Sequence, residues 1–297
     1  MTTLAELETV LSVARLRSFR AAATALGVST SAVSHTIAGV EKRLGVRLFN
    51  RTTRSVAVTD AGAAFVASIS PALLEIRSAM ETAGSSGGTP SGSLRINTSA
   101  AAALRCMPLF MDFVARYPAI HLDIVTDGRL IDIVADGYDA GIRLAQSIPQ
   151  DMISVQIEPA LRYVVVGAPA LVAAIGAPAT PADLLSKPCI RMRMPSGAIY
   201  RWEFVHEGLA LDIDVRGVLT LDNPALIREA ARGGLGLAYL AEWHVADDLA
   251  QGRLLQVLAD AALTVEGLCL YFPGHRHVPP SLRALVDMAR ERFRSRR

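Results

Sequence analysis

The sequence predicts an α/β protein in two parts, and three observations support this prediction. Two short amphipathic helices are predicted in residues 18–45, a stretch rich in glycine and serine interrupts the chain at 84–92, and predicted strands alternate with helices beyond it. With 297 residues, the chain is also too long for a single core of ordinary size. We therefore expect a small helical domain, a connecting segment and a larger α/β domain.

The predicted helix pair begins at Ser18. Ser18 is suited to cap the first helix and Gly27 to end it, because a hydroxyl oxygen accepts the N–H groups of a helix start and glycine adopts the left-handed conformation that follows a helix end. Ser29 is suited to cap the second helix, which runs to Gly45. These are the dimensions of a helix-turn-helix, whose second helix enters the major groove of DNA.

The second helix of this pair has two distinct faces. Its apolar residues recur at steps of four, three and four, and they are Val33, Ile37, Val40 and Leu44. Its small polar and basic residues fall off that stripe, and they are Ser31, Ser34, His35 and Lys42. We therefore expect one edge of the helix to pack on its neighbours and the other to face outward. The alternative is a two-helix corner within an ordinary core.

A small hairpin is predicted directly after this pair. Residues 46–49 and 55–58 are suited to pair around a tip at 50–54, where Arg51, Thr52 and Arg54 would meet phosphates as the wing of a winged helix-turn-helix. Residues 1–60 contain eight Lys and Arg against four Asp and Glu, a net charge of +4, whereas the whole chain has +2 and the remainder therefore −2. Positive charge concentrated on this segment favours double-stranded DNA as the partner.

Residues 1–60 resemble the DNA-binding domain of LysR-type transcriptional regulators. The matching stretch is FRAAATALGVSTSAVSHTIAGVEKRLGVRLFNRTTRSVAVTDAG, and the resemblance continues in domain order through nearly all of the chain. One departure is that Thr30 and Ser31 stand where the family often has a Gln-Pro pair. A base contact by a long amide side chain is therefore unavailable at that point.

We expect the second helix to read bases and the wing to hold phosphates. Because serine and threonine discriminate bases poorly, we expect much of the specificity to come from DNA shape and from His35. The predicted DNA-binding residues are Ser18, Thr30, Ser31, Ser34, His35, Lys42, Arg51, Thr52 and Arg54.

A long helix is predicted to follow the wing. Thr59 is suited to cap it, and it runs to about Thr82 with an apolar stripe of Phe65, Ile69, Leu73, Ile76 and Met80. A single seam of this kind suits a dimeric coiled coil. The alternative is that the stripe packs on its own domain. The resemblance implies a linker helix that pairs two subunits and sets the spacing of their recognition helices. We expect a DNA-binding domain at 1–59, a linker helix at 60–83, a hinge at 84–92 and an effector-binding domain at 93–297.

Alternating strands and helices fill the rest of the chain. We predict strands at 94–98, 121–126 and 140–144 with helices at 99–116 and 130–135, which is the pattern of a mostly parallel sheet covered on both faces. A second run has strands at 163–167, 189–194, 218–221 and 235–240 with helices at 181–185 and 224–232. A strand at 268–272 and a helix at 281–294 then return to the first lobe. This predicts lobe I at 93–162 and 268–297, lobe II at 163–267, and a ligand cleft between them as in a periplasmic binding protein.

The predicted effector site lies at the ends of strands that face this cleft. Thr98 and Ser99 open a helix, and free N–H groups with two hydroxyls form an anion site. Arg143 ends a strand and is a counter-charge for a carboxylate, or else forms an ion pair with Asp127, Asp136 or Asp139. The resemblance implies effector contacts at Ser99, at Arg143 and near Pro195, and its subgroup implies a small acidic effector. The full predicted set is Thr98, Ser99, Arg143, Pro195, Ser196 and Asn223.

Other classes of protein find little support. No run of eighteen apolar residues predicts a membrane span, and the N-terminus lacks the order of a signal peptide, so we expect a cytoplasmic protein. Three distant cysteines favour buried reduced thiols over a redox-sensing pair, a disulfide or a zinc site. The chain has no P-loop, Gly-x-Ser-x-Gly elbow or CxxC motif, and Gly233–Gly236 follows a helix instead of preceding one. We therefore expect no enzyme activity, no cofactor and no metal.

Three functions compete for this pattern. The first is a DNA-binding regulator that responds to a small anionic effector and binds its operator as a dimer of dimers, a homotetramer. The second is a DNA-binding repressor whose α/β domain serves only oligomerisation. The third, a solute-binding protein with an incidental helical cap, is excluded by the absence of an export signal and by the basic winged helix-turn-helix. Polar residues converging on the cleft favour the first.

Overall fold

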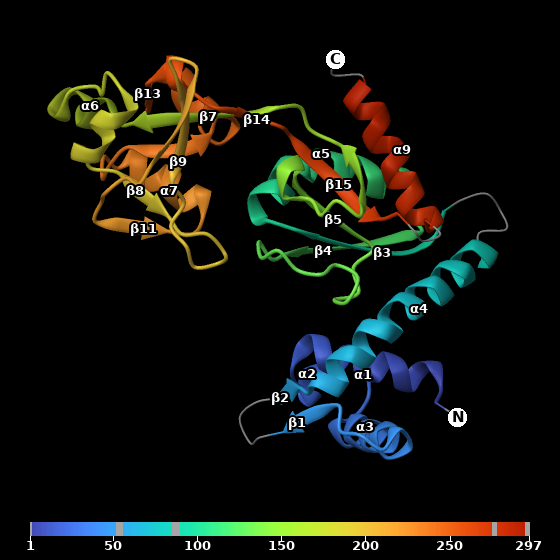
Figure 1. Cartoon of the computed structure of the whole chain (residues 1–297). Helices are drawn as coiled ribbons and strands as arrows, with labels where there is room; N and C mark the ends of the chain where they lie inside the picture. The colour runs from blue at the N-terminus through green and yellow to red at the C-terminus, as the bar shows by residue number, and fades with distance from the viewer. Residues whose placement is uncertain (1, 52–55, 85–89, 275–277, 295–297) are drawn as a thin grey trace.

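The computed structural model of the chain describes residues 2–51, 56–84, 90–274 and 278–294. A small helical domain lies at one end, a long helix rises from it, and two α/β lobes follow (Figure 1). The predicted α/β fold with a helical N-terminal domain is confirmed. Within the described residues, no helix combines the length and the apolar character needed to cross a membrane.

The N-terminal domain contains helices α1 (Leu4–Leu16), α2 (Phe19–Leu26) and α3 (Thr30–Leu44). The hydroxyls of Ser18 and Ser29 accept the N–H groups of Ala21 and Ala32 at 3.2 and 3.1 Å, so both predicted caps are present. Gly27 and Gly45 end α2 and α3 with φ values of 67° and 72°, a conformation that costs glycine little. The predicted helix boundaries follow from these local signals.

The wing is a two-stranded antiparallel ribbon of β1 (Phe49–Arg51) and β2 (Val56–Val58). The Glu41 carboxylate accepts the N–H groups of Leu48 and Phe49 at 2.8 and 3.2 Å, which attaches the ribbon to α3. Residues 52–55, the predicted tip, lie outside the described residues. Thr59 caps the next helix, as expected, by accepting the Gly62 N–H at 2.9 Å.

The long helix α4 (Asp60–Gly84) carries the apolar stripe that was predicted as a dimer seam. The first part of this stripe is packed within the chain and the second part is exposed. Phe65 and Ile69 pack against the core of the N-terminal domain, and Leu73 is buried. Only Ile76 and Met80 are exposed, at 43% and 65%. The first half of the stripe therefore packs on its own domain, which was the alternative, and the seam prediction is wrong for that half because α1 and the wing already cover it.

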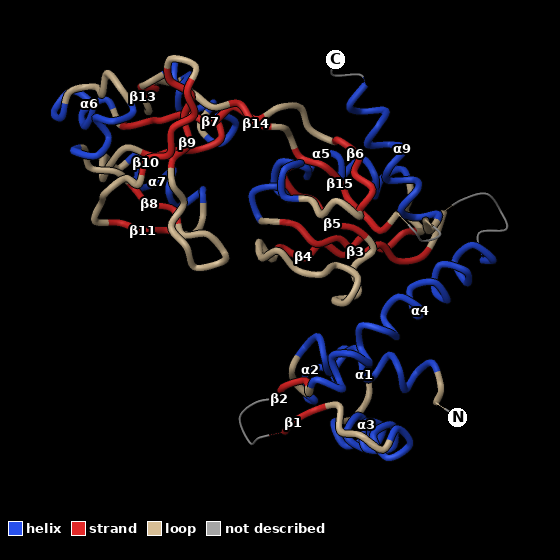
Figure 2. The backbone as a smooth tube through the Cα atoms, in the orientation of Figure 1, coloured by secondary structure: helices blue, strands red, loops and turns tan. Residues whose placement is uncertain are grey.

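Lobe I is built on a five-stranded mixed sheet (Figure 2). Strand β3 (Gly92–Thr98) runs parallel to β4 (Ile120–Thr126) and β5 (Ala140–Leu144). Strand β15 (Leu268–Pro273) runs antiparallel to β5 and to β6 (Met152–Gln156), so the C-terminal part of the chain completes the sheet as predicted. Helices α5 (Ala100–Arg116) and α9 (Pro280–Arg294) pack on it.

The helix predicted at 130–135 is wrong, and the structure has turns there. The Asp132 carboxylate accepts the N–H groups of Val134 and Ala135 at 2.9 and 3.0 Å. An aspartate that bonds the backbone two and three residues ahead stabilises a turn in competition with a helix. A short 3₁₀ turn, η1 (Ala145–Ser147), follows β5.

Lobe II departs further from the prediction. Its central strand β7 (Leu161–Gly167) is flanked by strands that all run antiparallel to it, namely β12 (Ala238–Ala241), β13 (Leu255–Val257) and β14 (Thr264–Val265). Only β8 (Ile190–Met192) and β11 (Leu219–Leu221) pair in parallel. The mostly parallel sheet predicted from the first run of strands holds for β3, β4 and β5 but does not extend to lobe II, because a strand buried on both faces has the same apolar pattern in either direction.

The helices of lobe II are short. They are α6 (Pro169–Ile175), η2 (Pro181–Ser186), α7 (Pro224–Arg232), η3 (Glu242–His244), α8 (Ala246–Ala250) and η4 (Ala259–Ala261). A hairpin of β9 (Trp202–His206) and β10 (Leu209–Ile213) was not predicted. Its two-residue turn is Glu207-Gly208, with φ values of 51° and 76°, the positive pair that a tight hairpin requires.

The chain passes between the lobes twice, as predicted. The first crossing precedes β7 and the second separates β14 from β15. Gly267 lies in the second crossing, where an added Cβ would come within 2.0 Å of the Pro159 carbonyl oxygen. The two crossing segments therefore touch backbone to backbone, and no larger residue fits at this point.

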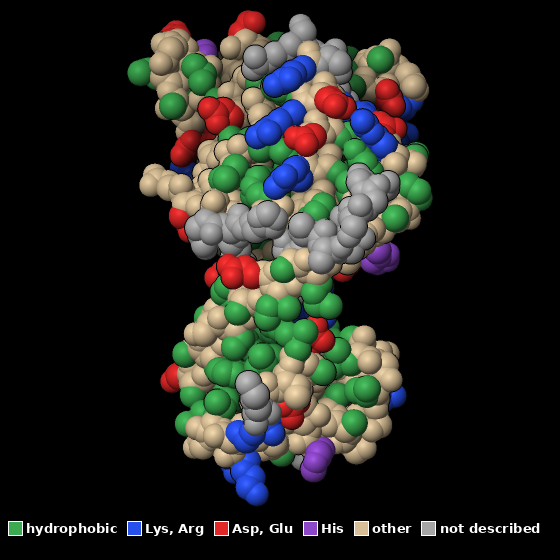
Figure 3. All heavy atoms as spheres, turned by 90° about the vertical axis from the view of Figure 1, so that its right-hand side faces the viewer, with side chains coloured by type: hydrophobic (Ala, Val, Ile, Leu, Met, Phe, Trp, Pro, Cys, Tyr) green, Lys and Arg blue, Asp and Glu red, His purple; other side chains and the backbone are tan. Residues whose placement is uncertain are grey.

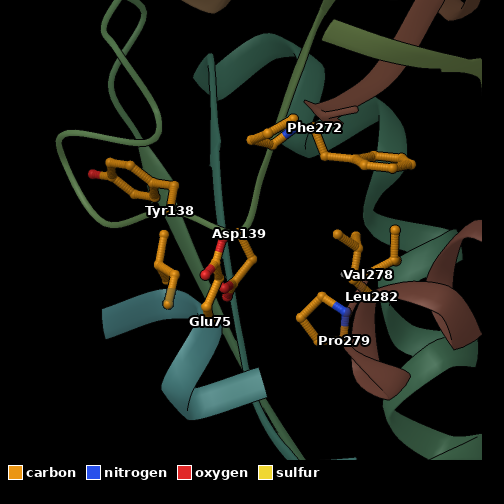
Figure 4. A pocket seen from close by; sticks show the side chains of 9 residues that line it. Glu75, Tyr138, Asp139, Phe272, Val278, Pro279 and Leu282 are labelled. Carbon is orange, nitrogen blue, oxygen red and sulfur yellow. The ribbon is translucent and has the colours of Figure 1, made fainter. Parts of the chain in front are cut away.

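Lobe I meets the linker helix across a small seam. The Ser70 hydroxyl of α4 lies within hydrogen-bond distance of two carbonyl oxygens, that of Val66 in its own helix at 2.8 Å and that of Ala135 in lobe I at 3.3 Å. Beside it lies a cavity of about 30 Å³, with Glu75 and Asp139 on one side and Phe272, Val278, Pro279 and Leu282 on the other (Figure 4). That volume holds about one water molecule, so the seam is a packing contact and no ligand site.

Candidate DNA-binding surface and effector cleft

The outward face of α3 presents the residues predicted to meet DNA. Thr30, Ser31, His35 and Lys42 are exposed, and Ser34 is half-buried. On the opposite face, Val33, Ile37 and Val40 are at most 1% exposed. Ser31, His35, Ala38 and Lys42 follow one another at steps of four, three and four and so share one line along the helix. The structure thus brings these predicted residues together.

The remaining predicted DNA contacts are Ser18 at the start of α2 and three residues of the wing. Ser18 is half-buried, and its oxygen is occupied by the cap of α2. Thr52 and Arg54 lie outside the described residues, and only the backbone of Arg51 is described. The Ser31 hydroxyl bonds the Ser29 hydroxyl at 2.9 Å, so it supports the start of α3 as well.

Two further cations belong to this domain but were not predicted as contacts. Arg20 and Arg47 are exposed, and in the described part of the chain no ion pair involves them or Lys42. Arg43, in contrast, pairs with Glu6 at 2.8 Å. The net charge counted from the sequence includes Arg20, Lys42, Arg43 and Arg47 alike. Only the structure shows that Arg43 is in an ion pair.

A cavity of about 700 Å³ lies between the lobes. Four of the predicted effector residues line it: Ser99, Arg143, Pro195 and Asn223. Thr98 and Ser196 are not among the lining residues. Thr98 is fully buried and donates to the Ile142 carbonyl at 3.4 Å, and Ser196 is exposed. The end of β3 turns Thr98 inward, because successive residues of a strand face opposite sides of the sheet.

Arg143 is the buried charge of this cavity, with 7% of the residue exposed. One terminal nitrogen donates to the carbonyls of Asp127 and Arg129 at 3.0 and 2.9 Å and also to the Asn97 side-chain oxygen. Its Nε, itself buried, has no hydrogen-bond partner among the residues that the structure describes. Neutral oxygens therefore hold the guanidinium in place without cancelling its charge.

The alternative ion pairs for Arg143 do not form. Asp127 pairs with Arg129 at 2.6 Å, which lowers the pKa of its carboxyl group. Asp139 accepts the Arg95 N–H at 2.7 Å, and burial followed by the nearby Asp132 raises the pKa of Asp136. Among the described residues no ion pair includes Arg143, and burial lowers its own pKa. The positive charge is thus available to a ligand.

Two helix starts open onto the same cavity. The Ser99 hydroxyl accepts the Ala102 N–H at 3.2 Å and its carbonyl accepts the Ala103 N–H at 2.8 Å. The first N–H groups of α5, those of Ala100 and Ala101, precede these bonds, and both residues line the cavity. Asn223 caps α7 by accepting the Ala225 N–H at 2.8 Å.

An aromatic wall was missed by the sequence reasoning. Tyr163, Tyr239, Trp243 and His244 line the cavity from lobe II and the crossing. The rings of Tyr163 and Tyr239 stack at 5.2 Å, and Trp243 stacks on His244 at 3.6 Å. Burial and the nearby Arg228 lower the pKa of His244 to about 4, so this imidazole is neutral at neutral pH. No local signal gathers these residues, because β7 and β12 are about 70 residues apart in sequence.

Other chemistry has little basis in the described residues. They contain no group of three His, Cys, Asp or Glu side chains arranged to hold a metal ion. All three cysteines are buried, and burial raises the pKa of the Cys189 thiol to about 12, which suppresses its reactivity.

Known proteins match both parts of the chain. The model of the lysR family of bacterial regulatory helix-turn-helix proteins matches residues 4–63, and that of the LysR substrate binding domain matches residues 87–294. The uncharacterized HTH-type transcriptional regulator YcaN of Escherichia coli strain K12 is 40% identical over 96% of this chain and 93% of its own length.

Solved structures share the complete architecture. CrgA, a LysR-type transcriptional regulator from Neisseria meningitidis, has a TM-score of 0.60 and 25% identity, covering 98% of this chain and 99% of its own. The full-length structure of the Vibrio cholerae virulence activator AphB has a TM-score of 0.66 and 22% identity, covering 97% of this chain and 99% of its own. The second likeness concerns the fold alone.

Proposed function

The chain belongs to the LysR family of DNA-binding transcriptional regulators, and from this premise we propose how it uses its two surfaces. Members of this family are regulators and not enzymes, and they join a helix-turn-helix to an effector-binding domain. We propose that α3 of this chain reads operator DNA and that a small anion in the cleft between the lobes changes that binding.

The face of α3 supports the first half of the proposal. Ser31, His35 and Lys42 lie in one exposed line opposite a buried apolar edge, which is the arrangement of a helix that docks in a groove. His35 is the longest polar side chain in the first two turns, so we assign direct base readout to it. Lys42, Arg20 and Arg47, with Arg51 and Arg54 of the wing, would neutralise phosphates.

The environment of Arg143 supports the second half. A guanidinium that is 7% exposed and held only by neutral oxygens keeps its charge uncompensated. An anion in the cavity would gain a charge-assisted interaction with the guanidinium of Arg143 together with the first N–H groups of α5. An α/β domain that served only oligomerisation would have no use for such a group.

The same parts of the chain suggest how the two surfaces communicate. Residues 127–139 run from the cleft, where Gly128 and Leu130 line the cavity, to the linker helix, where Ala135 accepts the Ser70 hydroxyl. We propose that an effector closes the lobes, shifts this segment against α4 and so changes the angle between subunits and the bend of the DNA.

Exposed apolar faces favour a homo-oligomer. Helix α5 presents a line of exposed residues at steps of three, four and three, namely Leu104, Met107, Met111 and Val114. Ile76 and Met80 of α4 are exposed as well, and hydrophobic side chains gather on the lower body where α1 and α4 face the viewer (Figure 3). We propose a dimer of dimers, in which the second half of α4 and the outer face of α5 pair subunits, and a cytoplasmic location.

The observation that supports this function most directly is the exposed line on α3, and DNA selection tests it. Duplexes selected from a random library by the full chain would be measured by fluorescence anisotropy. We expect His35→Ala to relax selection at one position and Lys42→Ala to weaken all duplexes. Arg290→Ala, which removes an exposed charge from α9, serves as the control. Unchanged binding by both α3 variants would contradict the proposal.

A further inference from the structure

We propose that the cleft is built for a monoanion that joins one carboxylate to an aromatic or similarly flat apolar body. This inference rests on the proposed effector function and names the class of effector. It combines three features of the cavity: the predicted Arg143, whose charge is uncompensated among the described residues, a group of aromatic side chains that the sequence did not predict, and a volume of about 700 Å³.

The carboxylate end is in lobe I. Arg143 lines the cavity, and in the described part of the chain no carboxylate pairs with its guanidinium. Asn97 accepts a hydrogen bond from the same guanidinium, so the arginine is fixed before any ligand arrives. Ala100 and Ala101 add the first N–H groups of a 17-residue helix to the same cavity. A single carboxylate satisfies these donors.

The charge of the lining argues against a second carboxylate. Its formally charged side chains are Arg143, Arg193 and Asp222. Arg193 and Asp222 are both exposed and their formal charges sum to zero, and the neutral His244 adds no charge. The lining therefore has one net positive charge, and its one buried cation is Arg143, so a dianion would exceed the charge that the described lining compensates.

The aromatic wall has a fixed orientation. The Tyr239 hydroxyl donates to the Glu203 carbonyl at 2.6 Å, which turns it away into lobe II. The Tyr239 ring stacks on Trp202 at 5.5 Å and on Tyr163 at 5.2 Å, so its position is set by packing and not by a ligand. Tyr239 is only 4% exposed, so the ring surface open to a ligand is that of the half-buried Tyr163 and Trp243, which Tyr239 and His244 hold by stacking.

The volume agrees with this class. About 700 Å³ lies within the range of sites that enclose a ligand of ring size or larger. A short aliphatic acid would leave most of the aromatic wall in contact with water. Apolar side chains, among them Leu130, Leu161 and Leu240, make up much of the remaining lining, alongside the polar Ser99, Thr126, Ser147 and Asn223.

Titration calorimetry of the full chain tests the proposal with three probes. They are 4-phenylbutanoate, its neutral amide 4-phenylbutanamide, and hexanedioate, which has two carboxylates and no ring. We expect 4-phenylbutanoate to bind tightest and the amide about ten- to a hundredfold weaker, because it loses the charge-assisted hydrogen bonds. Binding of hexanedioate as tight as that of 4-phenylbutanoate would overturn the assigned class.

Variants locate the two ends of the ligand. Arg143→Ala should weaken 4-phenylbutanoate about ten- to a hundredfold and leave the amide unchanged, and Arg143→Lys should recover part of the loss. Trp243→Leu and Tyr163→Leu should weaken 4-phenylbutanoate several-fold and leave hexanedioate unchanged. Tyr117→Leu, in lobe I and outside the cavity, is the matched aromatic control, and thermal melts verify that each variant folds.

Two failures are distinguishable. If hexanedioate binds as tightly as 4-phenylbutanoate and Arg143→Ala abolishes that binding, the class is wrong but the cleft remains an effector site. If none of the three probes binds while the selected DNA still does, both the class and the anionic effector are wrong, and the domain serves oligomerisation alone. If Arg143→Ala loses 4-phenylbutanoate binding but Trp243→Leu and Tyr163→Leu do not, the proposal that the ligand has an aromatic body is also overturned.

Discussion

Two regions of this molecule are suited to meet anions, and they do so under opposite conditions. The DNA-binding surface has several exposed cations, among them Arg20, Lys42 and Arg47, on a domain with a net charge of +4. The cleft has one dominant cation, Arg143, of which 7% is exposed. The first attracts a polyanion through many weak and screened contacts, and the second holds a small anion through one fixed and weakly screened contact.

This difference shows what the same side chain does in different surroundings. An exposed arginine contributes to an electrostatic field that depends on ionic strength. When it is removed, the neighbouring cations still attract the polyanion. A buried arginine held by carbonyl oxygens has no substitute within the described cavity lining, where Arg193 is exposed and offset by Asp222. Substitutions and solution conditions should therefore separate the two surfaces cleanly.

Ionic strength should produce the largest separation. Raising salt from about 50 to about 200 mM should weaken DNA binding about a thousandfold or more if the bound dimer neutralises six or more phosphates. The affinity for 4-phenylbutanoate should change by less than about threefold, because Arg143 is buried. Anisotropy and calorimetry across the same salt series measure both. Equal slopes would show that the two surfaces do not differ as described.

Acidification should act on the cleft side through His244. Its folded-state pKa is lowered to about 4, so the unfolded chain binds the proton more readily. Stability is therefore present above the unfolded value of about 6.5 and is lost as pH falls toward about 4, by about 1–3 kcal/mol.

Denaturant unfolding between pH 7 and pH 4.5 measures this loss in the wild type and in His244→Gln. The variant should show the smaller decrease over this interval, because it has no imidazole to protonate. An identical decrease in both proteins would mean that His244 is not held neutral in the folded state.

Within the DNA-binding surface, neighbouring residues should behave differently. His35→Ala should cost about 1–3 kcal/mol at one base pair and relax selection there. Lys42→Ala, two turns further along the same line, should weaken every duplex and reduce the salt slope by about one. Binding titrations on the selected duplex and on a scrambled one distinguish the two effects, and a sequence-selective loss in Lys42→Ala would place it among the base-reading residues.

The smallest effect should arise where the two regions are coupled. Ser70→Ala removes the hydroxyl that reaches Ala135 at 3.3 Å and shares its one proton with the Val66 carbonyl at 2.8 Å, so the contact to lobe I is worth at most about 0.5–1.5 kcal/mol. We expect the change in DNA affinity on adding 4-phenylbutanoate to shrink a few-fold, with each separate affinity nearly unchanged. Ser68→Ala is the matched control, because its hydroxyl bonds only within the helix, to Ala64 at 2.9 Å. If Ser70→Ala and Ser68→Ala show the same effect of 4-phenylbutanoate on DNA affinity, the contact between Ser70 and Ala135 does not couple the two sites.

The N-terminal domain was the more predictable region because its signals are local. Serine caps, glycine stops and the apolar stripe of α3 act within four residues of one another, and they placed α2 and α3 correctly. The same kind of signal failed at 130–135, where Asp132 favoured turns in a segment whose apolar residues suggested a helix. In lobe II the strands β7, β8, β11 and β12 were found but not the direction in which they pair, and β9, β10, β13 and β14 were missed.

The effector site divides in the same way. Ser99, Arg143, Pro195 and Asn223 were found because strand ends and helix starts are visible in sequence, and the structure places all four on one cavity. Thr98 was predicted to face the cleft, but it is fully buried and does not line the cavity. These site residues remain predictions until a ligand is measured.

The sequence by itself determined the family, the order of the domains and the polar face of α3, because each depends on residues adjacent in the chain. Only the tertiary structure decided that Arg143 has neutral partners, that the first half of the α4 stripe is already covered, and that Tyr163 and Tyr239 share a wall of the cleft. Those facts depend on strands brought together from distant positions. The pairing of these strands is set by burial and register in the folded state, and a local sequence pattern does not specify which distant strands pair.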